Sequence, residues 1–261
     1  MSISKNNSNG FFSLENSRQL LAMQMNDIEL EKTYRSKFSL SNDNTGEFWD
    51  GKFFSTHEQT LSNPMERDRN TTACAWFSHI VSNGFKSLNI GCGDGNFEEL
   101  ISNIPTAFEH TGADIATKTI RRLKSKFKRF KFISFNVIDD EFKKKYDVIS
   151  LFEVLEHIQT IHTLKVLRKI NKALENGGIF LLSVPMNEGL DVNYPYNPNE
   201  HQRMYTPDLI LSELRIAGFE VIRFKTFFAF SNYYRLKTFI ANNLLVTKWK
   251  PNNILVLCKK P

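Results

Sequence analysis

The chain has 261 residues, of which 41% are hydrophobic, and it carries a formal net charge of +6 at pH 7. This length is enough for one large domain or for one domain with an appendage, and the composition is neither that of a disordered protein nor that of a membrane protein. No run of 18 apolar residues occurs, and the polar first residues lack the apolar core of a signal peptide, so we expect no transmembrane helix and a cytoplasmic location. The three cysteines, Cys74, Cys92 and Cys258, are far apart and form no CxxC pair, which indicates reduced thiols.

The first 68 residues are predicted to form a helical and irregular extension that precedes one domain over residues 69–261. Helical spacing and good helix formers predict a helix over 16–37. The stretch 38–64, which contains Trp49, is predicted to be irregular. A further helix is expected over 65–82, and Asn83-Gly84 ends it.

From residue 86, short apolar runs alternate with amphipathic segments. The alternation favours an α/β fold, with a mostly parallel sheet covered by helices on both faces. The segment 186–206 is rich in Asn, Pro and Tyr and is predicted to be a long loop between a strand and a helix. Strands are expected at 86–90, 111–115, 131–137, 146–152, 177–185, 219–228 and 253–260.

A glycine-rich loop follows the first predicted strand. Gly91, Gly93 and Gly95 lie between this strand and a helix that begins near Asn96. Glycine lets a ligand lie against the main chain, and the helix N-terminus favours an acceptor or anionic group. Asp114 ends the second predicted strand, where an acid can bind ribose hydroxyls. The GxGxG spacing differs from the dinucleotide pattern GxGxxG, so a nicotinamide-dependent oxidoreductase is disfavoured.

Four motifs in chain order resemble those of class I S-adenosylmethionine (SAM)-dependent methyltransferases. They are LNIGCGDGNF at 88–97, YDVISLFEVLEHI at 146–158, LENGGIFLLSVP at 174–185 and LRIAGFEVIRF at 214–224. The resemblance spans about residues 70–260. It implies an enzyme with a Rossmann-like, seven-stranded sheet whose last strand is antiparallel, and with SAM as cofactor.

The resemblance also implies which residues bind the cofactor. The backbone of Gly91, Cys92 and Gly93 would line the methionine part, and Asp114 would bind the ribose. Asn89 and Asn136 stand where the family often carries Asp, and Asn retains an acceptor oxygen without the charge. The predicted cofactor-binding set is Asn89, Gly91, Cys92, Gly93, Gly95, Asp114, Ile115 and Asn136 with Val137 at the adenine, and Leu151 with Phe152 near the sulfonium.

Acidic and histidine side chains follow the fourth predicted strand. Glu153, Glu156 and His157 have i, i+3 and i+4 spacing, which would place them on one face of a helix at the ligand-binding edge of the sheet. With His201 from the long loop they could hold Mg²⁺, Mn²⁺ or Zn²⁺. This arrangement is similar to the ExxEH helix of ubiquinone-biosynthesis O-methyltransferases and Hen-type RNA methyltransferases. Alternatively, His157 is a base or a packing residue, Glu153 is a solvated acid at a helix start, and His201 is a surface histidine.

The predicted activity is SAM-dependent methylation of a hydroxyl on a small molecule, such as a sugar, a lipid-linked intermediate or a phenol. His157 or His201 would remove the proton, or a metal would assist. Tyr194, Tyr196, Met204 and Tyr205 would provide an apolar pocket for the acceptor.

Two segments of the sequence, and the function itself, leave alternatives open. The segment 118–131 has eight basic residues and no acid, which suits either an RNA 2′-O-methyltransferase or a solvated helix face. A non-catalytic SAM-fold binding protein is the other alternative. The aromatic segment 225–245 is either core, a lid or a partner surface. The acceptor, the oligomeric state and the role of residues 1–68 are not fixed by the sequence.

Overall fold

The structure is a computed structural model, and it describes residues 44–53, 63–187, 201–245 and 248–261. Seven strands form one sheet in the order β3-β2-β1-β4-β5-β7-β6. Their bounds are β1 (Lys86–Ile90), β2 (Glu109–Asp114), β3 (Lys131–Ser134), β4 (Tyr146–Phe152), β5 (Leu174–Pro185), β6 (Glu220–Phe227) and β7 (Asn253–Lys259). Neighbouring strands from β3 to β5 pair in parallel, whereas β7 pairs antiparallel with both β5 and β6. The expected seven-stranded sheet with an antiparallel last strand is confirmed.

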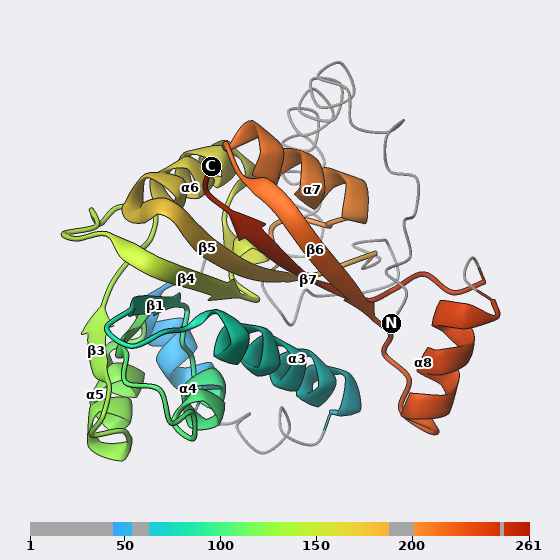
Figure 1. Ribbon diagram of the computed structural model, residues 1–261, viewed down its shortest axis with the longest axis horizontal. Helices are drawn as coiled ribbons and strands as arrows, with labels where there is room; N and C mark the ends of the chain where they lie inside the picture. Colours follow the sequence, from blue (N-terminus) through green and yellow to red (C-terminus); the bar gives the residue numbers. More distant parts are fainter. Residues whose placement is uncertain (1–43, 54–62, 188–200, 246–247) are drawn as a thin grey trace.

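Helices cover both faces of this sheet (Figure 1). One face carries α6 and α7, and the other carries α3, α4 and α5. Side chains alternate between the faces along each strand, so Val148 of β4 packs on the α3 side and its neighbour Ile149 on the α6 side. The helix bounds are α3 (Pro64–Ile80), α4 (Asn96–Ile101), α5 (Thr117–Lys126), α6 (Thr160–Ala173), α7 (Pro207–Ile216) and α8 (Tyr234–Asn243), with the short 3₁₀-helix η1 (Leu155–His157) after β4.

The N-terminal part agrees only partly with the sequence prediction. The helix expected over 65–82 is present as α3, where Asn63 caps the first turn by accepting a hydrogen bond from the Met65 amide at 3.0 Å. The stretch around Trp49 was expected to be irregular, which is wrong, because residues 46–53 are helical. Asp50 stabilises this helix against the domain, since its carboxylate accepts hydrogen bonds from the amides of Lys118 and Thr119 at the start of α5. The helix predicted over 16–37 lies outside the described residues.

The basic segment 118–131 forms α5 and the turn that follows it. The helix buries Thr119, Ile120 and Leu123 and turns its basic side chains outward. Lys126 pairs with Glu99 at 2.8 Å, and Arg129 donates to main-chain carbonyl groups of the turn after α4. These internal contacts favour the interpretation as a solvated helix face. Among the described residues, no helix is both long enough and apolar enough to span a bilayer.

The long loop predicted over 186–206 is described only at its two ends. Met186 bridges to Tyr205, and the Asn187 amide donates to the Tyr205 carbonyl at 2.9 Å. These contacts bring His201 back to the carboxyl edge of β5. The predicted aromatic residues Tyr194 and Tyr196 lie outside the described residues.

Candidate active site

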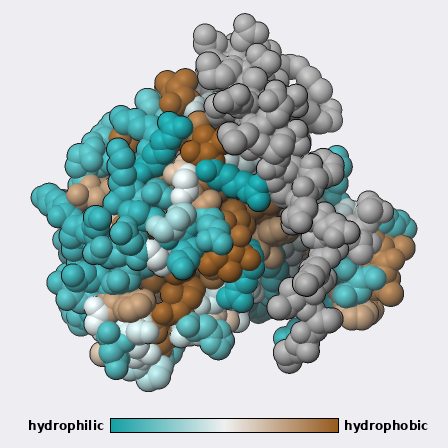
Figure 2. All heavy atoms as spheres, turned by 45° about the horizontal axis from the view of Figure 1, so that its top comes forward, coloured by the Kyte–Doolittle hydropathy of each residue, from teal (hydrophilic) through white to brown (hydrophobic). Residues whose placement is uncertain are grey.

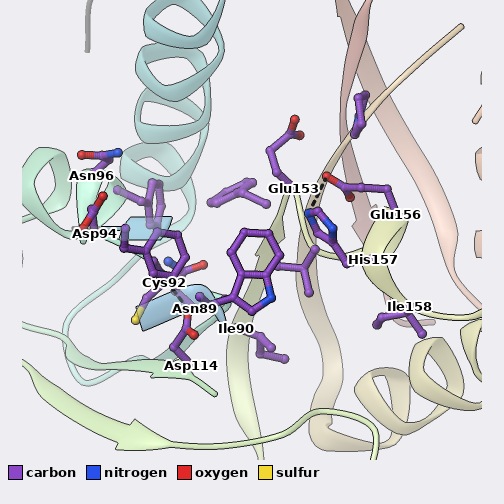
Figure 3. Close-up of a pocket in the computed structure, with 18 of the residues that line it drawn as sticks. Asn89, Ile90, Cys92, Asp94, Asn96, Asp114, Glu153, Glu156, His157 and Ile158 are labelled. Atoms are coloured by element: carbon purple, nitrogen blue, oxygen red, sulfur yellow. Dashed lines mark hydrogen bonds and ion pairs between the residues drawn. The ribbon is translucent and has the colours of Figure 1, made fainter. Parts of the chain in front are cut away.

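A cavity of about 620 Å³ lies at the carboxyl ends of the central strands. Figure 3 shows Cys92, Asp94 and Asp114 along one wall and Glu153, Glu156 and His157 along the other. We call the first wall, with residues 91–94, 114–115 and 135–138, the glycine side. We call the second, with Trp49, Met65, Arg69, residues 152–154 and 156–157, and His201, the histidine side.

The glycine loop forms a close turn at the end of β1. Gly91 and Gly93 have φ values of +72° and +48°, a region that L side chains rarely adopt. The amides of Gly91 and Cys92 both donate to the Ala113 carbonyl of β2, at 2.7 and 3.0 Å. A Cβ atom on Gly91 would lie 2.1 Å from Cγ2 of Val154, so the loop packs directly against the segment that carries the histidine side.

Asp114 ends β2 beside this loop, as predicted. Its carboxylate accepts hydrogen bonds from the amides of Gly93 and Ala116, each at 2.9 Å, and the side chain lines the cavity. Burial raises the pKa of Asp114 to about 6, although both backbone hydrogen bonds lower it. Each oxygen retains lone pairs beyond the one amide that it accepts, so the carboxylate can also receive hydroxyl donors from the cavity.

The third strand end completes the glycine side. Ile115, Asn136 and Val137 line the cavity. Asn136 also holds its own turn, because its Oδ1 accepts from the Ile138 amide at 3.0 Å and its Nδ2 donates to Asp139 at 2.7 Å. An apolar surface with an amide group beside it is suited to an adenine ring.

Two predicted cofactor-binding residues do not line the cavity. Leu151 is fully buried in the α6-side core, because it points away from the cavity on β4. Gly95 is the N-cap of α4 and faces α5, where a Cβ atom would lie 2.7 Å from Leu123. The next residue on β4, Phe152, does line the cavity and packs edge-on against Phe97.

Asn89 belongs to a buried polar chain that explains why the first strand carries an amide. Its Nδ2 donates to Glu98 of α4 at 2.8 Å, and its Oδ1 accepts from Ser150 at 3.0 Å. The same Glu98 oxygen lies 3.2 Å from Nε2 of His110, whose Nδ1 lies 2.8 Å from Ser87. An Asp at position 89 would face the Glu98 carboxylate, whereas Asn supplies the donor that this carboxylate needs.

Glu153 is not on a helix with Glu156 and His157, and that prediction is wrong. It directly follows β4 with φ of +53°, before η1 begins. Its carboxylate lies 2.8 Å from Arg69, accepts from Ser183 at 2.6 Å and accepts from Asn253 at 2.8 Å. These three donors explain why Glu153 stays apart from the histidines.

The other three predicted metal ligands come together. Glu156, His157 and His201 each place a ligand atom within 4.8 Å of the other two. Nε2 of His157 lies 3.8 Å from a Glu156 oxygen (Figure 3). The ring centroids of His157 and His201 are 4.8 Å apart. The Gln202 amide donates to the Glu156 carbonyl at 2.7 Å, which fixes the returning loop beside η1. One carboxylate and two imidazoles can exchange protons with a substrate or bind a divalent cation.

Aromatic residues from the N-terminal helix also line the cavity, and sequence reasoning missed them. The Trp49 ring lies edge-on to His157 at 4.8 Å and stacks on Phe53 at 5.5 Å. The dense aromatic run FWDGKFF at 48–54 was the available signal. The aromatic pocket expected from the long loop is not formed by its described part, since Tyr205 is buried away from the cavity and Met204 is 41% exposed.

Comparison with known proteins assigns this site to a family. The family model described as a methyltransferase domain matches residues 53–223. An uncharacterized protein, MJ0638 of Methanocaldococcus jannaschii, is 24% identical over 64% of this chain and 69% of its own length. The ubiquinone biosynthesis O-methyltransferase of Pseudomonas putida is 23% identical over 69% of this chain and 84% of its own length.

Solved structures give the same fold. The N-methyltransferase NodS of Bradyrhizobium japonicum, in complex with S-adenosyl-L-homocysteine, is similar with a TM-score of 0.57 at 15% identity, covering 76% of this chain and 89% of that one. Together with the glycine loop, the buried acid at the end of β2 and the seven-stranded sheet, the family match leads to one conclusion. The chain belongs to the methyltransferase domain family and is a class I SAM-dependent methyltransferase.

Proposed function

We propose that this methyltransferase modifies a hydroxyl group of a small molecule. The observation that supports this is the convergence of Glu156, His157 and His201 within 4.8 Å, on the wall opposite the glycine loop. A hydroxyl is a poor nucleophile until its proton is removed or its pKa is lowered, whereas a neutral amine needs neither to the same extent. A cluster of one carboxylate and two imidazoles is therefore most useful to an oxygen acceptor.

The residues of the cavity fit an adenosyl ligand. Bound SAM supplies the methyl group, and this chain supplies its orientation. Asp114 would accept hydrogen bonds from the ribose hydroxyls, and the open backbone at Gly93 would lie against the methionine part. Asn136 and Val137 would flank the adenine. Holding the acceptor in line with the methyl group is mainly an effect of orientation, for which the rigid strand ends are suited.

The histidine side would hold the acceptor. Trp49 and Met65 offer an aromatic and aliphatic surface, and the Glu153–Arg69 pair adds polar groups beside it. His201 or His157 would take the proton of the hydroxyl. A divalent cation held by Glu156, His157 and His201 would lower the pKa of the same hydroxyl, and the mixed oxygen and nitrogen set suits Mn²⁺ or Zn²⁺ better than Mg²⁺.

Paired acceptors test the proposal directly. Methyl transfer from isotopically labelled SAM is measured to a phenol and a catechol, and to the corresponding anilines. We expect the hydroxyl compounds to be methylated, with kcat falling about 100-fold in Glu156→Gln and in His201→Gln. Affinity for S-adenosylhomocysteine should stay within about twofold in both variants. His162→Gln is the matched control, because His162 is nearby on α6 and does not line the cavity.

Chelation distinguishes activation of the hydroxyl by a divalent cation from activation by a histidine base alone. If a cation acts, dialysis against EDTA abolishes transfer and added Mn²⁺ or Zn²⁺ restores it, and the same ion raises the thermal unfolding midpoint of the wild-type chain but not of His201→Gln. If the histidines act directly, EDTA has no effect while His201→Gln remains slow. Methylation of the anilines that is faster than that of the corresponding hydroxyl compounds would contradict the proposed oxygen acceptor. An unchanged kcat in both Glu156→Gln and His201→Gln would contradict it as well.

A further inference from the structure

The helix α8 carries large apolar side chains on its solvent side. Leu236 and Phe239 are 59% and 58% exposed, and Tyr233, just before the helix, is 79% exposed. Figure 2 shows hydrophobic side chains at the right edge of the molecule, which is where α8 lies in the view of Figure 1. An exposed apolar face of this kind usually marks an interaction site.

A different face of α8 already packs on the domain. Ala241 is buried, and the Tyr234 hydroxyl donates to Asp68 of α3 at 2.9 Å. In a helix of 3.6 residues per turn, Tyr234 and Ala241 lie on the side opposite Leu236. The exposed apolar side chains are therefore not needed to hold α8 in place.

The charges on α8 border the apolar stripe on both sides. Leu236, Phe239 and the half-buried Ile240 lie close together around the helix, while Arg235 and Lys237 lie about 100° to either side of Leu236. Both basic side chains are exposed, and neither has an acidic partner among the described residues. An apolar stripe between two basic edges is typical of a helix that lies in the plane of a membrane surface.

The sequence around α8 has one sign of charge. Residues 221–261 contain no Asp or Glu, and the exposed Lys248 and Lys250 flank Trp249 after the helix. Trp249 is half-buried against Phe230, which places an amphipathic ring beside the two lysines. Trp and Tyr side chains with neighbouring Lys and Arg are enriched where proteins meet lipid headgroups.

The segment that contains α8 also begins and ends at the cavity. Ala229, Asn252 and Asn253 line the cavity, and the Ala229 amide donates to Asn252 at 2.8 Å. Residues 229–252 thus leave the cavity rim after β6 and return to it before β7. A surface bound by α8 would lie next to the opening through which an acceptor enters.

We propose that α8 binds this enzyme to an anionic phospholipid bilayer, with Leu236 and Phe239 in the acyl boundary and Arg235 and Lys237 at the phosphates. A second copy of the chain fits the face less well. A symmetric contact of two α8 helices would bring the like charges of Arg235 and Lys237 close together, and residues 221–261 contain no acid to offset them. Anionic headgroups, by contrast, complement these charges.

Vesicle flotation of the full-length protein tests this without SAM or an acceptor. We expect binding to vesicles of phosphatidylcholine mixed with phosphatidylglycerol, and little binding to phosphatidylcholine alone. The double variant Arg235→Gln/Lys237→Gln should lower the partition coefficient about 30-fold. The double variant Leu236→Asn/Phe239→Asn should lower it at least about tenfold, since it removes the inserted apolar groups.

The control variants remove charged and apolar side chains of the same kinds from surfaces away from α8. Lys124→Gln/Lys128→Gln removes two exposed charges from the α5 region, and Ile161→Asn replaces the 63% exposed Ile161 of α6. Both controls should bind vesicles within about twofold of wild type, and all variants should keep the wild-type affinity for S-adenosylhomocysteine. The proposal is overturned if anionic vesicles do not bind or if the α5 variant loses as much as the α8 variant. It is equally overturned if light scattering shows a dimer that Leu236→Asn/Phe239→Asn dissociates.

Discussion

The two sides of the cavity are assembled in different ways. The glycine side comes from residues at or just after the carboxyl ends of β1, β2 and β3, so the parallel sheet itself brings Gly93, Asp114 and Asn136 together. The histidine side joins residues that are far apart in sequence, such as Trp49, Arg69 and His201. The proposed cofactor site is therefore built into the topology of the fold, whereas the proposed acceptor site depends on contacts between distant segments.

Gly91→Ala should have the largest effect, because the two sides touch at this residue. The added Cβ would lie 2.1 Å from Cγ2 of Val154, and the φ of +72° is strained for any L side chain. Overpacking and strain together should lower the free energy of unfolding by about 4 kcal/mol. Urea unfolding followed by circular dichroism measures this loss.

Gly84→Ala is the control for Gly91→Ala. Gly84 has a similar φ of +81°, but nothing lies within 4 Å of its added Cβ. It should lose only about 1 kcal/mol from backbone strain. Adding Val154→Ala to Gly91→Ala should restore part of the stability. Equal losses in the two single variants would show that the glycine loop does not pack tightly against the histidine side.

Asp114→Ala should weaken S-adenosylhomocysteine binding about 100-fold, because the charge-assisted hydrogen bonds to the ribose are lost. Isothermal titration calorimetry gives the dissociation constant. Asp147→Ala is the matched control, because Asp147 also accepts a main-chain hydrogen bond, from Lys86 at 2.7 Å, but lies at the other end of β4. Similar affinity in Asp114→Ala and wild type would remove the acid from the cofactor site.

The same difference between the two sides explains what the sequence could predict. The glycine loop and Asp114 each lie next to a strand in the chain. Their positions in space could therefore be predicted from the order of the strands in the sheet. The antiparallel last strand was implied by the resemblance to class I methyltransferases, and the structure confirms it. Leu151 was misplaced because alternation along β4 turns its side chain into the α6-side core, whereas Phe152 lines the cavity.

The arrangement of the histidine side could not be predicted from the order of the strands. Glu153 has helical spacing to Glu156, but its partners Arg69, Ser183 and Asn253 come from distant parts of the chain and hold it in a left-handed turn at the end of β4. No local sequence pattern predicts hydrogen-bond or ion-pair partners that are so far apart in the chain. Trp49 lies against His157 because Asp50 attaches the N-terminal helix to the start of α5 and Asn44 donates to the His157 carbonyl at 3.1 Å. These contacts join residues 68 or more positions apart.

Asn89→Asp tests the buried polar chain under the glycine side. The new carboxylate would face Glu98, with which Asn89 now shares a hydrogen bond of 2.8 Å between fully buried groups. We expect the variant to lose about 2 kcal/mol of stability. The double variant Asn89→Asp/Glu98→Gln exchanges the two groups and should recover most of the loss in urea unfolding. No recovery would show that the pair interaction is not the cause.

Arg69→Met should affect the histidine side alone. It leaves the Glu153 carboxylate, whose side chain is 28% exposed, without its cation, and should lower the stability by about 1.5 kcal/mol. Affinity for S-adenosylhomocysteine should remain within about twofold, since Arg69 belongs to the other wall. Arg67→Met, two residues away on the same helix, is the control for the loss of a charge. A large loss of cofactor affinity in Arg69→Met would contradict the division of the cavity into two sides.

The smallest expected effect is a dependence of cofactor binding on pH. Burial raises the pKa of Asp114 to about 6, and the ionised carboxylate is the form that accepts hydrogen bonds from a ribose. Its ionised fraction falls about tenfold between pH 7 and pH 5, so calorimetry should show about tenfold weaker binding of S-adenosylhomocysteine at pH 5. Because this pKa is higher in the folded chain than the ordinary value of 3.8, the ligand-free protein should gain stability from this group as the pH falls from 6 towards 4. Asp114→Asn should remove both dependences; if its affinity still falls tenfold, another group controls the binding.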